Sequence, residues 1–71
     1  TDRAKSLAWY RKAAQRQHPR AALMLGLYLR DGIATAPDLE AARRCFTFAA
    51  EAGLDEAKDA LAALPPAAAA E

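Results

Sequence analysis

Apolar residues recur along this chain at intervals of three and four, which is the spacing of one face of a helix. In the first segment, Leu7, Tyr10, Ala13 and Ala14 mark such a face. Alanine, a strong helix former, is abundant throughout, and the runs of valine, isoleucine and threonine that are typical of strands are missing. The pattern therefore predicts an all-α chain.

Residues with helix-capping chemistry divide the chain into four expected helices. Pro19 suits the first turn of a helix because it lacks an amide hydrogen, and Asp38 can accept hydrogen bonds from the free amides of a first turn. Gly32 and Gly53 can adopt the positive φ of a helix end. The short connections between these segments predict antiparallel neighbours. Asp2 is expected to cap the first helix in the same way as Asp38. The expected helices span about residues 3–17, 19–30, 39–52 and 55–64.

The chain also resembles itself at an offset of 36 residues. Tyr10 aligns with Phe46, and the other matched positions are mainly small residues. Small residues let helix backbones approach, and an aromatic and a leucine fill the gaps between them, so the shared positions indicate stacking rather than a catalytic site. The identical pairs are Asp2 and Asp38, Ala13 and Ala49, Ala14 and Ala50, Ala21 and Ala57, and Leu25 and Leu61.

Two motifs, WYRKAA at residues 9–14 and AALMLGLYLRDG at residues 21–32, are followed by matching positions up to Ala57. In this order and spacing they resemble the Sel-one-like repeat, a relative of the tetratricopeptide repeat that builds α-solenoids from paired helices. The resemblance implies one complete repeat, about residues 19–54, flanked by two half repeats. Gln17 and Ala34 stand where the family has glycine, which leaves the loop conformation open.

The expected organisation is a helical repeat region over residues 1–64 and a Pro/Ala-rich tail or linker over residues 65–71. Such repeats bury a continuous core only by stacking, and about three are normally needed for stability. We therefore expect this chain to be a fragment of a longer repeat array. Its alanine- and arginine-rich composition is typical of a GC-rich bacterial genome.

The net charge of +1 conceals an uneven distribution along the chain. Residues 1–30 contain seven basic residues and one acid, whereas residues 31–71 contain three basic residues and eight acids. The basic half could attract phosphate or an acidic protein, and its simplest interpretation is a solvated face. The two oppositely charged ends also favour head-to-tail stacking with neighbouring repeats or with another copy.

Candidate catalytic and metal-binding residues are scarce. His18, the only histidine, lies at an expected turn, and Cys45, the only cysteine, lies on the apolar face of the third expected helix, so both are interpreted as structural. The acids at 55, 56 and 59 open a helix, where they favourably meet the positive end of its dipole. No cofactor or metal is expected. A single cysteine does not identify the compartment, so both cytoplasm and periplasm stay open. The chain contains no run of about 18 apolar residues, so we expect no membrane insertion.

The second expected helix is apolar almost all round, so one of its rows is left over after packing against its neighbours. In an α-solenoid of this family, the first helix of each pair lines the concave surface. We therefore predict a non-catalytic interaction module that binds a peptide or partner protein there, although the same row could instead pack against a preceding repeat. The expected partner-binding residues are Arg20, Leu23, Met24, Leu27, Tyr28 and Arg30.

Two alternative functions stay open at this point. The basic first helix could bind nucleic acid, although only Trp9, Tyr10 and Tyr28 could stack on bases there, and Tyr10 is an expected core residue. The region could also regulate an enzyme whose catalytic domain lies outside this chain.

For the packing of the helices, we expect the main contributions from Trp9, Tyr10, Leu25, Phe46, Leu61 and the paired alanines.

Overall fold

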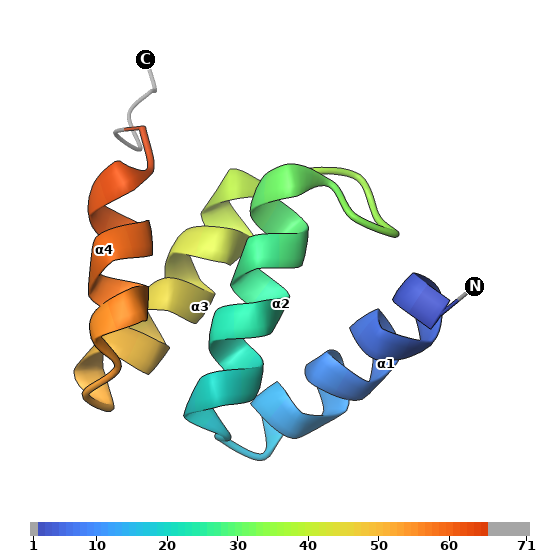
Figure 1. Ribbon diagram of the computed structural model, residues 1–71, viewed down its shortest axis with the longest axis horizontal. Coiled ribbons are helices and arrows are strands. Elements are labelled where there is room, and N and C mark those ends of the chain that lie inside the picture. Colours follow the sequence, from blue (N-terminus) through green and yellow to red (C-terminus); the bar gives the residue numbers. More distant parts are fainter. Residues whose placement is uncertain (1, 66–71) are drawn as a thin grey trace.

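The computed structural model describes residues 2–65 and contains four helices in that range. They are α1 (Asp2–Gln15), α2 (Pro19–Asp31), α3 (Leu39–Glu51) and α4 (Asp55–Ala63). Each helix packs against the next one in the chain, so that α1 and α4 lie at opposite ends of the row (Figure 1). The all-α prediction, with four helices arranged as stacked antiparallel pairs, is confirmed.

Asp38, Pro19 and Gly32 perform their expected roles at helix ends, whereas Asp2, predicted to precede the first helix, lies within the first turn of α1. Asp38 accepts a hydrogen bond from the Ala41 amide at 3.0 Å and so begins α3. Pro19 occupies the first turn of α2, and Gly32 ends that helix with a φ of 71°. His18 directly precedes α2 and accepts from an amide of its first turn, so its predicted structural role is also confirmed.

The two turns in which the family has glycine keep a glycine-like backbone. Gln17 has a φ of 63° and Ala34 a φ of 62°, both in the left-handed region that side chains with a Cβ rarely adopt. The left-handed Gln17 ends α1 earlier than predicted: the helix stops at Gln15, and the His18 amide bonds to the Ala13 carbonyl at 3.1 Å. Both turns therefore carry local backbone strain.

Phe46 occupies the centre of the core, between α2 and α3. Its side chain is fully buried, and so are Ala42 and Ala49 on the same helix. Gly26 lets α2 approach the phenylalanine ring, because a Cβ added to this glycine would lie 2.6 Å from Phe46 Cε1. At the far end of the row, Arg43 of α3 donates a hydrogen bond to the Pro65 carbonyl just after α4.

Most of the residues predicted to hold the stack do so. Leu25 and Phe46 are buried, and Tyr10 and Leu61 are partly buried and pack against the core. Trp9 was predicted to join them, and this prediction is wrong, because its side chain is 59% exposed. Trp9 lies about 200° around the helix from Leu7 and about 100° from Tyr10, so it falls outside the inward face that these two residues define. Of the expected tail at residues 65–71, only Pro65 lies within the described residues.

Candidate partner-binding surface

The helix α2 lies between α1 and α3 and turns its remaining side outward. Met24, Leu27 and Tyr28 are half-buried on this helix, and Leu27 and Tyr28 also pack against the core. Leu23 differs from them, because only 3% of its surface is exposed and it belongs to the core. Leu23 therefore offers almost no area to a partner. The candidate surface consists of the other apolar residues of the predicted set.

Aromatic side chains border this surface on the α1 side. The rings of Tyr28 and Tyr10 meet edge to face, with centroids 5.3 Å apart. Tyr10 makes a similar contact with Trp9 at 5.7 Å. Such edge-to-face pairs are favourable because the positive edge of one ring meets the negative face of the other. They connect the half-buried row on α2 with the exposed tryptophan on α1.

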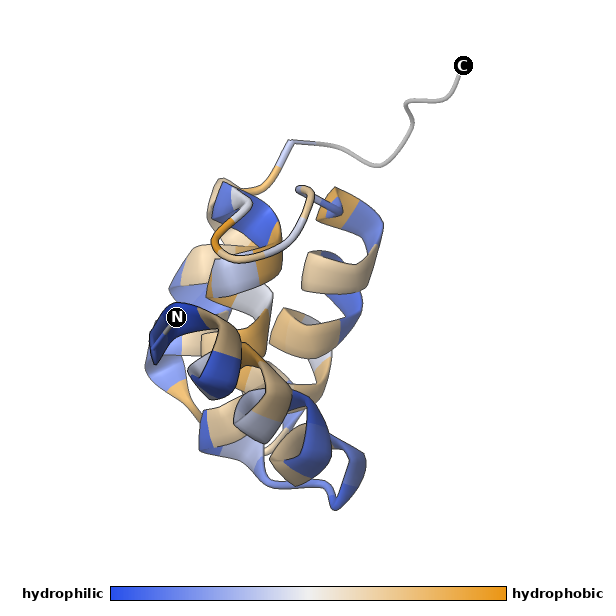
Figure 2. Ribbon diagram, turned by 90° about the vertical axis from the view of Figure 1, so that its right-hand side faces the viewer, coloured by the Kyte–Doolittle hydropathy of each residue, from blue (hydrophilic) through white to orange (hydrophobic). Residues whose placement is uncertain are grey.

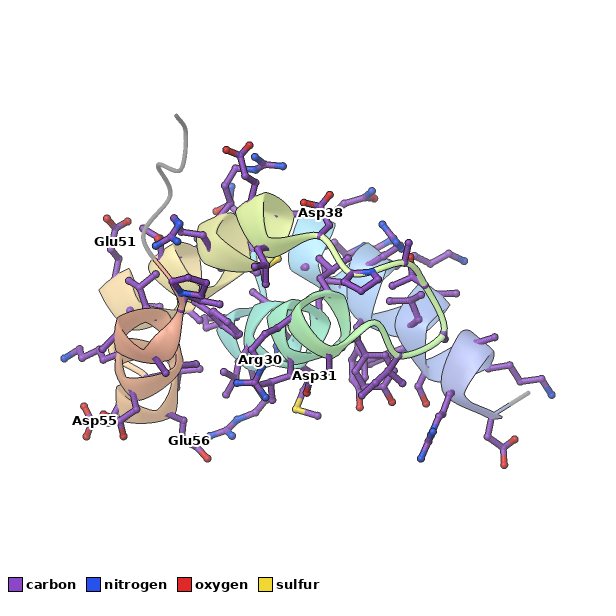
Figure 3. All side chains as sticks on the ribbon, turned by 90° about the horizontal axis from the view of Figure 1, so that it is seen from above. Arg30, Asp31, Asp38, Glu51, Asp55 and Glu56 are labelled. Atoms are coloured by element: carbon purple, nitrogen blue, oxygen red, sulfur yellow. The ribbon has the colours of Figure 1, made fainter. Side chains whose placement is uncertain are left out.

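The two arginines predicted at the rim each have an acidic partner within the chain. Arg20 forms an ion pair with Glu56 of α4 at 2.8 Å, and both side chains are more than half exposed. Arg30 donates two hydrogen bonds to the carboxylate of Asp31, at 2.8 and 3.0 Å. Asp31 and Glu56 lie on one side of the molecule, opposite Asp38 and Glu51 (Figure 3).

The Arg30 and Asp31 pair changes the titration of both groups. The hydrogen bonds from Arg30 hold the pKa of the Asp31 carboxyl below its ordinary value. The same bonds raise the pKa of Arg30. Both groups are charged at neutral pH, and an acidic ligand that approaches Arg30 has to compete with a carboxylate already in place.

The described residues offer little that resembles an enzyme site. Within residues 2–65, no group of three or more histidine, cysteine, aspartate or glutamate side chains could hold a metal ion. Burial raises the pKa of the Cys45 thiol, and the nearby charges of Arg44 and Arg11 oppose this rise only in part. A thiol in this state is a weak nucleophile at neutral pH. No helix in the described part is long and apolar enough to cross a membrane.

Two exposed apolar side chains were missed at the level of sequence. Besides Trp9, Leu39 in the first turn of α3 is 41% exposed. For Trp9 a signal was present, since Leu7 and Tyr10 already define the inward face of α1, and Trp9 lies outside it. For Leu39 we find no such signal, because its exposure depends on how α3 lies against its neighbours.

Comparison with known protein families identifies the repeat. The model of the Sel1 repeat matches residues 1–18 and 19–54, which together are most of the chain. Searches of curated proteins and of solved structures gave no match. Sel1 repeats are helical solenoid repeats that generally mediate protein–protein interactions and are typically non-catalytic. Two matched segments and four stacked helices lead to the same conclusion, and the chain belongs to the Sel1 repeat family.

Proposed function

We propose that this chain is a non-catalytic adaptor or scaffold module that binds a peptide or a partner protein on the outward side of α2. Met24, Leu27 and Tyr28 form the apolar floor of this surface, and Arg20 and Arg30 stand at its rim. Leu23 supports the floor from the core. The observation that carries the proposal is the partly exposed apolar row on a helix that is otherwise packed on both sides.

Physical arguments favour this role over a purely structural one. Met24 is unbranched and flexible, so it adapts to varied partner surfaces. Tyr28 combines a large apolar ring with a hydroxyl group, a combination that is enriched at interfaces. The arginine pairs at the rim are exposed, and such pairs contribute only about 0 to 1 kcal/mol each, so a partner can exchange them at small cost.

The test is a capture experiment with the 71-residue chain on a solid support and a lysate of its source organism, run with and without nuclease. The decisive variant is Met24→Glu, because Met24 is half-exposed and lies outside the buried core. Leu39→Glu is the matched control, since it introduces the same charge at an exposed apolar position on α3. Circular dichroism verifies that both variants retain their helices.

We expect the parent chain and Leu39→Glu to capture the same partner protein, with and without nuclease. Met24→Glu should no longer capture it. Equal capture by all three chains would place the binding elsewhere and refute the α2 surface. Capture that disappears after nuclease treatment would instead support the alternative function, nucleic-acid binding.

A further inference from the structure

The first helix carries cations that have no acidic partner within the described chain. Among residues 2–65, the ion pairs are Arg20 with Glu56, Arg30 with Asp31, and Lys58 with Asp55. None of these pairs involves a cation of α1 or of the turn that follows it. The unpaired cations of this region, all exposed, are Arg3, Lys5, Arg11, Lys12 and Arg16.

Three of these cations share one face of the helix with the exposed tryptophan. Lys5, Trp9, Lys12 and Arg16 follow each other at spacings of four, three and four residues, which place side chains in one row along a helix. Arg16 lies just after α1 and continues its path, because its amide bonds to the Ala13 carbonyl at 3.0 Å. We name this row of four residues the basic stripe.

The basic stripe lies outside the packed side of α1. Leu7 is the buried residue of this helix, and Tyr10 and Ala14 pack against the core with it. The stripe lies on the opposite side of the helix from these three, and all four of its residues are exposed. The Trp9 ring also meets the ring of Tyr10 edge to face. Figure 2, viewed onto the α1 end of the molecule, shows strongly hydrophilic residues alternating with apolar ones along this helix.

Two features of this charge arrangement are unfavourable for the isolated helix, although Lys12 in the last turn favourably meets the negative end of the helix dipole. Lys12 and Arg16 are like charges four residues apart, which repel each other on a helix surface. Lys5 lies in the first turns, where the positive end of the helix dipole disfavours a cation. An acidic ligand along the stripe would relieve both effects, and over about 16 Å of helix it would meet three cations.

We propose that the basic stripe binds an acidic helical segment of a partner protein, with one apolar side chain of that segment against Trp9. Its carboxylates pair with Lys5, Lys12 and Arg16. Trp9 supplies the apolar anchor, because tryptophan is enriched among the residues that contribute most to binding energy at interfaces. The basic stripe differs from the surface proposed on α2 in its cations, because Arg20 and Arg30 on α2 are already paired with acids. The ring contacts of Trp9, Tyr10 and Tyr28 join the two surfaces at one edge.

The aromatic groups favour a protein ligand over a nucleic acid. Single strands bind along rows of aromatic side chains on which successive bases stack. Here Trp9 is the exposed aromatic, whereas Tyr10 and Tyr28 are half-buried and meet edge to face. One exposed ring between cations suits a single apolar anchor among carboxylates.

The test uses the fluorescence of Trp9, which is the only tryptophan of the chain and lies within the stripe. The probe is a synthetic helical peptide of about 15 residues with glutamate, phenylalanine, glutamate and glutamate at spacings of four, three and four, which repeats the spacing of the stripe. Its matched control has glutamine at every glutamate position. A single strand of about 15 thymidines is the nucleic-acid probe.

We expect the glutamate peptide to shift the Trp9 emission in a saturable way at low salt. The variant Lys12→Glu with Arg16→Glu should weaken this binding about tenfold or more, and added salt should weaken it as well. Arg3→Glu with Arg11→Glu, an equal charge reversal at two positions off the stripe, should change the affinity less than about twofold. Trp9→Ala should lower the affinity for the glutamate peptide about tenfold, as measured by calorimetry.

Each alternative result would overturn the proposal. If the glutamine peptide binds as tightly as the glutamate peptide, charge does not determine the binding. If the thymidine strand binds more tightly than the glutamate peptide, the stripe is a nucleic-acid surface. If the parent chain sediments as a dimer and the stripe variant as a monomer, a second copy of the chain occupies the stripe. If the charge reversal lowers helicity, Lys12→Gln with Arg16→Gln replaces it, and unchanged binding by that variant would also be decisive.

Discussion

Replacing Gly26 with alanine tests the close approach of α2 and α3. Helix propensity alone predicts that Gly26→Ala stabilises the protein by about 1 kcal/mol, because glycine is unfavourable in a helix interior. The structure predicts the opposite sign. The new Cβ would lie 2.6 Å from Phe46 Cε1 and 2.8 Å from Cδ1, whereas carbon atoms prefer roughly 3.5–4.0 Å.

The magnitude follows from how little the neighbour can move. Phe46 is fully buried, so its ring cannot turn away into solvent. Overpacking of a core costs about 1–3 kcal/mol, and two ring atoms in collision place this case near the upper end. After the gain in helix propensity is subtracted, we expect a net loss of about 2 kcal/mol, which lowers the Tm by about 8–16 °C in a domain of this size.

The assay is thermal and urea unfolding followed by circular dichroism, with a double-mutant cycle. Phe46→Leu makes room at the site, so Gly26→Ala should cost about 1 kcal/mol less in that background than in the parent chain. If Gly26→Ala raises the Tm, or if its effect is the same in both backgrounds, the two helices do not meet at this glycine and the reasoning is refuted.

Three further predictions concern the turns, one helix cap and the single thiol. Gln17→Gly and Ala34→Gly should each raise the free energy of unfolding by about 0.5–1 kcal/mol. A left-handed backbone costs a residue with a side chain about 1–2 kcal/mol, and the greater conformational entropy of glycine in the unfolded chain offsets part of the gain. Ala36→Gly, in the same loop as Ala34 but without a positive φ, should not stabilise the protein. Asp38→Ala removes the cap of α3 and should cost about 1 kcal/mol in urea unfolding, and no loss would show that this cap contributes nothing. The Cys45 thiol has a raised pKa in the folded state, so its contribution to stability should be complete below the ordinary thiol pKa of 9.0 and should be lost as the pH rises through the folded value. Unfolding curves between neutral and alkaline pH should show this loss for the parent chain and not for Cys45→Ala, and alkylation of the folded thiol should be slow at neutral pH.

Local chemistry determined much of this protein from the sequence. The number and order of the helices follow from capping residues and apolar spacing, both of which act within a few residues along the chain. Asp38, Pro19 and Gly32 were assigned correctly because a cap or a turn depends on the backbone beside it. The self-similarity at 36 residues then indicated how the helix pairs stack, because matching residues in successive repeats bury corresponding helix faces.

Tertiary structure decided which side chains are free to bind. The helical period shows which residues share a face, but it does not show how a neighbouring helix covers that face. Leu23 and Met24 are adjacent in a helix that is apolar almost all round, yet packing buries the first and leaves the second half-exposed. Arg20 finds Glu56 one repeat further along the chain, and only the stacked helices bring these two side chains to 2.8 Å. Such contacts join residues far apart in sequence, and their distances depend on the packing of whole helices.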